Sequence, residues 1–303
     1  GGDQPSPKGS TYYSFNDGAW ENIDTWSLNA GVYNEPSQLP GSEDIVVIQL
    51  GKTVTMNGND VVIAKIEVND GTLDLKNTSG HNFNTITGLA NGKIKLSTDN
   101  FPAGDLSGFA NASTGGTVEY YGEGFELLQA RTFRNLVINM TDATNQIVLL
   151  SDYTLNGSLS IVKGEFLFGN GTETSSRNLT VKEHVEILSG GKIRTGSGNA
   201  RHQFNIYGNF TNQGDVQFTN RTAANYTAEA SDGIVDVNFL SGIRNQFMVL
   251  EGPSRFYRIV ISKGTASTYE LNISATQASY FELFGYANET TQRLPSWQAI
   301  LML

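Results

Sequence analysis

The stretch Gly71-Thr72-Leu73-Asp74-Leu75 carries the pattern that decides the fold: a glycine, any residue, an apolar residue, a polar residue and a second apolar residue. Strict alternation of apolar and polar residues after a glycine is typical of a half-buried β-strand that leaves a turn. The same pattern, in which the polar position varies, occurs seven times in the chain. The other six copies begin at Gly92, Gly116, Gly164, Gly191, Gly214 and Gly233.

The spacing of these glycines indicates a repeat. Successive copies are separated by 21, 24, 48, 27, 23 and 19 residues, and residues 133–138 (Phe-Arg-Asn-Leu-Val-Ile) supply a further predicted strand inside the long gap. A period of about two dozen residues is typical of a β-solenoid, in which each coil buries an apolar face against the next. We therefore expect an all-β fold, a right-handed parallel β-helix. The alternative is a series of β-sandwich repeats, whose strands also alternate and are also bounded by glycines.

Turn residues separate the predicted strands. Asn57-Gly58, Asn69-Asp70-Gly71 and Ser189-Gly190-Gly191 are combinations that supply the positive φ of sharp corners. We expect residues 1–10 to be a flexible lead-in, residues 11–50 an N-terminal cap with the first strands, and residues 51–303 the coils. Residues 296–303 are strongly apolar. This apolar stretch predicts that the coils continue beyond the end of the chain, because an exposed apolar edge is a liability.

The composition excludes several classes of function. The 20 Lys and Arg against 30 Asp and Glu give a net charge of −10, which argues against nucleic acid or an anionic membrane as a partner. The chain has no Cys, so disulfides, Cys-ligated zinc, iron–sulfur clusters and a thiol nucleophile are excluded. The 3 His leave little room for a His-rich metal site. No run of about 18 apolar residues occurs, so we expect no membrane span in this chain.

The N-terminal part of the chain resembles a known group of proteins. The motifs that carry the resemblance are Asn16-Asp17-Gly18-Ala19-Trp20, Asp24-Thr25-Trp26-Ser27, Leu39-Pro40-Gly41, Asp44-Ile45-Val46-Val47-Ile48 and Gly51-Lys52-Thr53-Val54-Thr55. Together they resemble the opening of large secreted β-helical proteins from Bacteroidetes, and they are similar to the start of the eight-glycine domain of some surface proteins. Later segments are similar to the repeats that continue such proteins.

This resemblance implies an extracellular or cell-surface location in a bacterium after removal of a signal peptide. It implies export, often by the type IX secretion route, and a role in adhesion or gliding. The expected partners are proteins or glycans at the cell surface and the secretion machinery. We therefore expect a structural or adhesive protein that presents an extended surface and is not an enzyme. The alternatives are a carbohydrate-active enzyme (a polysaccharide lyase or hydrolase) on the same fold, and a passive stalk or spacer.

Two tryptophans and two aspartates form the first candidate site. Trp20 and Trp26 with Asp17 and Asp24 could bind a glycan, since aromatic rings stack on sugar rings and carboxylates accept hydrogen bonds from their hydroxyls. The competing interpretation is that the tryptophans cap the first coil and shield its apolar end from water. We favour capping.

A basic patch is the second candidate. Lys182 and His184 alternate, and so do Lys192 and Arg194. If both segments are strands, each pair projects from a single face. A polysaccharide lyase would need such cations to neutralise a uronate, together with a base. The competing interpretation, which we favour, is a solvated outer face.

The sequence predicts no resident cofactor. Asp17, Asp60, Asp70 and Asp232 could contribute oxygen ligands to Ca²⁺, but they lack a dense Asp-x-Asp spacing and stand where turns are expected. Asn-x-Ser/Thr triplets are frequent, which we attribute to composition in a bacterial chain.

Overall fold

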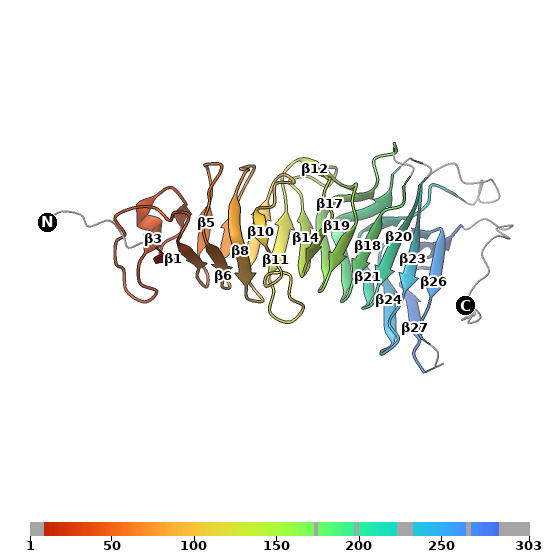
Figure 1. Cartoon of the computed structure of the whole chain (residues 1–303). Helices are drawn as coiled ribbons and strands as arrows, with labels where there is room; N and C mark the ends of the chain where they lie inside the picture. Colours follow the sequence, from red (N-terminus) through yellow and green to blue (C-terminus); the bar gives the residue numbers. More distant parts are fainter. Residues whose placement is uncertain are drawn as a thin grey trace. The chain divides into compact units, whose positions relative to one another are not determined.

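The chain folds almost entirely into β-strands. The computed structural model describes residues 9–172, 175–196, 198, 200–222, 233–264 and 268–284. Within these residues the only helical segments are two single 3₁₀ turns, η1 (Ile23–Thr25) and η2 (Ala278–Tyr280). The predicted all-β class is confirmed (Figure 1). Residues 1–8 and 285–303, including the apolar residues 296–303, lie outside the described residues.

The chain forms two compact units. Unit 1 contains Gly1–Gly122 and Phe133–Val137, and unit 2 contains Glu123–Thr132 and Ile138–Leu303. Two strands, β13 (Arg131–Phe133) and β14 (Asn135–Asn139), have residues in both units.

Unit 1 contains two series of short strands. The first series is, in spatial order, β10 (Ala103–Asp105), β8 (Asn82–Gly88), β6 (Lys65–Val68), β4 (Ile45–Ile48), β1 (Thr11–Ser14) and β3 (Trp26–Ser27). The second is β2 (Gly18–Ala19), β5 (Thr53–Thr55), β7 (Thr72–Asp74), β9 (Lys93–Leu96) and β11 (Thr117–Tyr120), followed by β14. The ladders from β1 to β10 and from β2 to β11 are parallel, whereas β1 and β3 pair antiparallel.

Unit 2 is built in the same way. One group of strands comprises β12 (Gly124–Leu127), β15 (Gln146–Leu149), β17 (Leu159–Phe168), β19 (Val185–Thr195), β21 (Phe210–Asn212), β22 (Asp215–Gln217), β24 (Gln246–Leu250), β25 (Ser254–Phe256), β27 (Leu271–Ala275) and β28 (Glu282–Leu283). The other comprises β16 (Tyr153–Leu155), β18 (Asn178–Val181), β20 (Arg201–Ile206), β23 (Ile234–Phe239) and β26 (Arg258–Ile261). The ladders of both groups are parallel.

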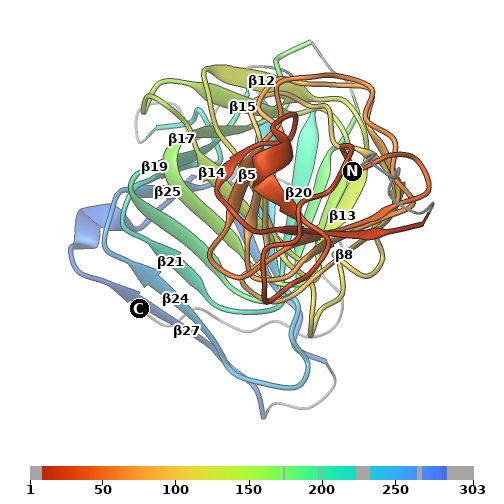
Figure 2. The same cartoon turned by 90° about the vertical axis from the view of Figure 1, so that its left-hand side faces the viewer.

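The last nine strands of unit 2 show how the chain fills these sheets. They form three sets in sequence order, which we call layers: β20/β21/β22, β23/β24/β25 and β26/β27/β28. Each strand pairs in parallel with the strand at the same place in the next layer, so that β21, β24 and β27 lie side by side (Figure 2). The β-sandwich alternative is wrong, because its strands would pair antiparallel.

The glycine-led pattern predicts strands correctly. All seven copies form strands, and six of them fall in the sheet that contains β7, β9, β11, β17, β19 and β22. Their apolar residues stack in register and are buried, as Leu73, Ile94 and Val118 are in unit 1. The copy at Gly233 differs: its strand, β23, belongs to the other sheet of unit 2 and pairs with β20. The spacing of 19 residues before it is therefore a step between sheets and not a repeat of one layer.

Two of the leading glycines, Gly92 and Gly214, stand where a side chain would collide with the backbone. A Cβ atom at Gly92 would lie 2.1 Å from the carbonyl oxygen of Val68, and one at Gly214 would lie 2.1 Å from that of Gly191. Neither glycine has a positive φ. Glycine is needed at these two positions because the backbone of a neighbouring strand, β6 or β19, lies where a side chain would begin. Of the predicted turns, Asn69-Asp70-Gly71 takes its positive φ (60°) at Asp70 and Asn57-Gly58 has none, whereas Ser189-Gly190-Gly191 lies inside β19 and was wrongly predicted as a turn.

Candidate functional site

The two tryptophans of the first candidate site are buried. Trp20 and Trp26 are 2% and 0% exposed, and their ring centroids lie 4.9 Å apart at 75°, an edge-to-face contact. Trp26 donates a hydrogen bond from Nε1 to the carbonyl oxygen of Trp20 at 2.8 Å, and Trp20 stacks on Phe83. Neither ring has a face on the surface on which a sugar could stack. The burial fits the capping interpretation.

The two aspartates beside the tryptophans hold turns together. Asp17 accepts a hydrogen bond at Oδ1 from the backbone N–H of Thr53 at 2.7 Å. Asp24 is the second residue of the 3₁₀ turn η1, where its N–H donates to Oδ1 of the N-cap residue Asn22 at 3.1 Å. The Asp17 carboxylate thus has a structural contact, whereas Asp24 makes its contact through the backbone.

The sequence reasoning missed a carboxylate in the same region. Glu21 accepts hydrogen bonds at Oε1 from the backbone N–H groups of Asn57 (2.9 Å) and Gly58 (2.7 Å). Burial acts to raise the pKa of Glu21, but these N–H donors outweigh it and lower the pKa below its usual value. Glu21 therefore joins the start of unit 1 to the turn that follows β5.

Another missed carboxylate explains part of the motif that carries the resemblance. Asp44 is 4% exposed and accepts hydrogen bonds from the N–H groups of Ser10 at Oδ1 (2.9 Å) and Gly41 at Oδ2 (2.8 Å). The Pro40-Gly41 turn and Asp44 therefore form one closed loop in front of β4. This contact has a structural role.

The predicted basic patch divides into two pairs with different neighbours. Lys182 and His184 precede β19 and are not in a strand. The Lys182 ammonium lies 4.0 Å from the centroid of the Tyr207 ring, and His184 accepts at Nδ1 the backbone N–H of Asn209 at 3.0 Å.

The other pair is matched by carboxylates. Lys192 lies 3.0 Å from Oε1 of Glu165, and Arg194 lies 2.9 Å from Oδ2 of Asp215. Lys192 and Arg194 do share the outer face of β19, as their alternation predicts. Their charges are balanced locally, which weakens the case for a uronate-neutralising site there.

The acidic turn residues do not gather. Asp60 and Asp70 take positive φ angles of 59° and 60°, and Asp70 accepts the N–H of Asn91 at 2.9 Å. In the described parts of the chain, no three His, Cys, Asp or Glu side chains are grouped closely enough to hold a metal ion. Asp232 lies outside the described residues.

An organised set of polar side chains lies on one face of β18, β20, β23 and β26 in unit 2, where Asp236 and Asn238 on β23 are buried and the side chains on the neighbouring strands are partly exposed. We call it the polar face; it consists of Asn178, Thr180, Arg201, Gln203, Asn205, Asp236, Asn238 and Arg258. The parallel register places Gln203, Asp236 and Arg258 in one row and Thr180, Asn205 and Asn238 in the next. The polar face thus repeats from strand to strand with the spacing of the sheet, about 4.8 Å.

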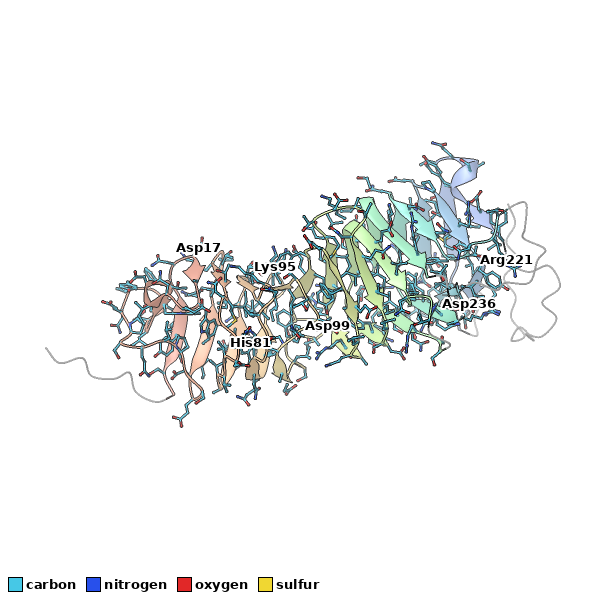
Figure 3. The ribbon with its side chains drawn as sticks, turned by 90° about the horizontal axis from the view of Figure 1, so that it is seen from above. Asp17, His81, Lys95, Asp99, Arg221 and Asp236 are labelled. Atoms are coloured by element: carbon cyan, nitrogen blue, oxygen red, sulfur yellow. The ribbon has the colours of Figure 1, made fainter. Side chains whose placement is uncertain are left out.

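Asp236 is the centre of the first row. Its side chain is 0% exposed, and Arg201 reaches it through Nε (2.7 Å to Oδ2) and Nη2 (3.2 Å to Oδ1). Arg258 donates to Oδ2 at 2.9 Å and Gln203 at 3.1 Å. A buried carboxylate surrounded in this way fixes the geometry of the donors around it. Figure 3 shows Asp236 in the same part of unit 2 as Arg221.

An amide ladder forms the second row. Asn238 donates from Nδ2 to Oδ1 of Asn205 at 2.9 Å and to Oε1 of Gln203 at 3.0 Å. Asn205 donates to Oγ1 of Thr180 at 3.2 Å. These side chains are held in fixed orientations by one another.

An aromatic ring borders this array. The guanidinium groups of Arg201 and Arg221 lie 5.2 and 5.5 Å from the centroid of the Tyr257 ring, within the range of a cation–π contact. The polar face therefore places the partly exposed amides of Gln203 and Asn205 beside planar guanidinium groups. These groups suit a hydroxyl-rich or carboxylated ligand.

The sequence does contain a signal for the polar face. Arg201, Gln203 and Asn205 alternate with His202 and Phe204, and Asp236 and Asn238 alternate in the same way. The signal is incomplete, because alternation shows that these residues share one side of a strand but not that β20 and β23 are neighbours.

Comparisons of the chain with protein-family models and curated proteins, and of its structure with solved structures, find no match. No helix in the described residues is long and apolar enough to cross a membrane.

Proposed function

We propose that this chain is a right-handed parallel β-helix of a bacterial cell-surface protein with a structural and adhesive role, whose polar face binds glycans. The observation that carries the proposal is the register of the polar face, in which Thr180, Asn205 and Asn238 occupy equivalent places on neighbouring strands. A repeated row of hydrogen-bonding groups matches a ligand that is itself a polymer with repeated hydroxyls.

The rigidity of the polar face supports this role. Asn205 and Asn238 are already oriented by their hydrogen bonds to Thr180 and Gln203. Ordering a side chain on binding costs about 0.5–1.5 kcal/mol, and a side chain that is ordered beforehand avoids most of this cost. The proposed glycan surface is a sheet face, whereas the tryptophan pair, the first candidate glycan site in the sequence, is buried.

The export and location of the protein rest on the resemblance of residues 16–55 to secreted Bacteroidetes proteins. We propose type IX secretion and exposure on the cell surface. Labelling of intact cells of the source organism with an antibody against the chain tests this part. Signal that appears only after the cells are permeabilised would overturn the proposed location.

Binding of the purified chain to a panel of polysaccharides tests the adhesive role. We expect binding by the native chain and at least a tenfold weaker affinity for the variant Asn205→Ala/Asn238→Ala. Thr211→Ala is the matched control, because Thr211 lies on the outside of β21 in the other sheet and its loss should leave binding unchanged. Native chain that binds no polysaccharide in the panel, or equal affinity in all three proteins, would contradict the proposal.

The same panel separates the alternatives. A spacer binds none of the polysaccharides. A lyase or hydrolase shortens one of them, which size-exclusion chromatography detects. Chain shortening that is lost in Lys192→Ala would favour the enzyme, with Lys192 acting from the basic patch.

A further inference from the structure

Two arginines share one buried carboxylate on the polar face. Oδ2 of Asp236 accepts a hydrogen bond from Nε of Arg201 at 2.7 Å and another from Nη2 of Arg258 at 2.9 Å. Because both donate to the same oxygen atom, the two guanidinium groups lie next to each other over Asp236. The Asp236 side chain is 0% exposed, whereas those of Arg201 and Arg258 are 26% and 24% exposed. A ligand in the solvent therefore meets the two guanidinium groups and not the carboxylate beneath them.

The charges on the polar face do not balance. Within β18, β20, β23 and β26 the Lys, Arg, Asp and Glu residues are Arg201, Asp236 and Arg258, so one carboxylate stands against two guanidinium groups. Asp152 lies at the far end of the same row, where its two carboxylate oxygens accept hydrogen bonds from Asn178 at 2.9 and 3.1 Å. The region around Asp236 therefore keeps an excess of positive charge.

A third guanidinium group adds to this excess. Arg221 and Arg201 both lie against the ring of Tyr257, with their guanidinium carbons 5.5 and 5.2 Å from its centroid. The net charge of −10 belongs to the whole chain, and at physiological ionic strength salt screens exposed charges that are more than about 8 Å apart. The local positive charge therefore acts on a ligand at the polar face more strongly than the distant carboxylates do.

Partly exposed amides lie directly beside the arginine pair. Gln203 stands between Arg201 and Asn205 on β20 and donates to Oδ2 of Asp236 at 3.1 Å. Asn205 follows two residues further along the same side of β20, about 7 Å away. A guanidinium group binds a carboxylate through paired, charge-assisted hydrogen bonds, and amides exchange hydrogen bonds with hydroxyls. The arrangement thus suits a ligand that carries a carboxylate and hydroxyls close together.

We propose that the glycan bound by the polar face is an acidic one, and that Arg201 and Arg258 hold the carboxylate of a uronic acid unit while Gln203 and Asn205 bind its hydroxyls. A uronic acid carries both kinds of group on one sugar ring. This inference rests on the proposed glycan-binding function and names the class of glycan. It places the carboxylate on β20 and β26 and not at the basic patch of Lys192.

Binding of the native chain to matched pairs of polysaccharides tests the proposal without any substitution. The probes are polygalacturonate, alginate and hyaluronate, each compared with the same polymer after methyl esterification of its carboxyl groups. Because the ester removes the charge that the guanidinium groups recognise, we expect one of these polymers to bind about tenfold more tightly in its acidic form. Equal affinity for both forms, or binding of neutral polysaccharides alone, would overturn the inference and leave the glycan-binding role intact. Binding of no polysaccharide would overturn both.

Three variants then locate the carboxylate. Arg258→Gln should remove the preference for the acidic form and keep the affinity for the ester, which also reports that the variant is folded. Arg255→Gln is the matched control, because it changes the net charge equally but lies on β25 in the other sheet, paired with Glu282 at 2.9 Å. Equal losses in these two variants would overturn the inference, since the attraction would then be a general effect of charge. A preference that survives in Arg258→Gln and is lost in Lys192→Ala would also overturn it.

Discussion

The first residues of unit 1 and the last layer of unit 2 solve the same problem in different ways. At the start of unit 1, the antiparallel strand β3 and the pair Trp20 and Trp26 leave the apolar interior almost fully buried. At the end of unit 2, Ile259 is half-buried and Leu283 is 48% exposed. A stack of parallel layers buries its own interior but cannot bury its ends, so an end needs residues outside the repeat. In the described part of the chain, the start of unit 1 contains such residues, in β3 and in the pair Trp20 and Trp26.

The largest expected effect is on the free energy of unfolding, and it tests the difference between the two ends directly. Trp26→Ala removes a fully buried ring and its hydrogen bond to Trp20, so we expect the free energy of unfolding of unit 1 to fall by about 3–5 kcal/mol. Leu283→Ala is the comparison at the other end, where an exposed side chain should cost less than about 1 kcal/mol. Urea unfolding followed by tryptophan and tyrosine fluorescence measures both. Equal costs would mean that the two ends are buried alike.

A smaller effect is expected at Asp44, which holds the loop in front of β4. Asp44→Ala leaves the N–H groups of Ser10 and Gly41 without their carboxylate partner, so unit 1 should lose about 1–3 kcal/mol. Asp105→Ala is the matched control, because Asp105 is exposed and caps a turn at Ser107. A loss at Asp44 no larger than that at Asp105 would show that the loop does not help to close unit 1.

The smallest expected effects are on pH dependence, and they differ between the two regions. In unit 1, burial lowers the pKa of His81 below its usual value of 6.5, against the nearby charges of Asp60 and Glu21. Neutral His81 accepts the N–H of Val61 at Nδ1. Below about pH 6.5 the unfolded chain binds a proton more readily than the folded chain, so the stability of unit 1 falls as the pH falls.

In unit 2 the stability is expected to change with pH at high pH. Burial, and then the charge of Arg244, lower the pKa of Lys263 from 10.5 to about 8. Between these values the unfolded chain binds the extra proton, so the stability of unit 2 rises as the pH rises from about 8 to 10.5. Urea unfolding between pH 8 and 10.5 tests this trend, and urea unfolding below about pH 6.5 tests the trend in unit 1. His81→Gln and Lys263→Met should each flatten the pH dependence of the stability of their own unit. An unchanged slope in either variant would assign the effect to another group.

The sequence predicts the strands well because their pattern is local. The alternation after Gly71 or Gly92 predicts which side chains are buried, and the structure places those apolar residues in register. The sheet to which a strand belongs depends on where the chain turns, which no local pattern contains. For this reason the sequence pattern did not predict that the strand after Gly233 belongs to the other sheet of unit 2.

The polar face as a whole could not be predicted from the sequence for the same reason, although the alternation within each strand was visible. Arg201, Asp236 and Arg258 are distant in the sequence and meet only through the register of β20, β23 and β26. Trp20 and Trp26 were identifiable as candidates, because aromatic residues ahead of a repeat have few roles other than covering its end or binding a ligand, and the structure buries both rings.

Neighbouring strands of unit 2 pair in parallel and in register, as β18, β20 and β23 do. The chain has no Cys, so pairs of introduced cysteines report on neighbouring strands without interference. Thr180 and Asn205 face each other in register on adjacent strands, and Asn238 lies one strand further. Adjacent strands are about 4.8 Å apart, within the reach of a disulfide, whereas strands two places apart are about 10 Å apart and beyond it.

The decisive measurement is therefore the thiol count after mild oxidation of two double variants. We expect Thr180→Cys/Asn205→Cys to form a disulfide and to lose both free thiols. Thr180→Cys/Asn238→Cys should keep both. Disulfide formation in the second variant and not in the first would contradict the layered parallel arrangement.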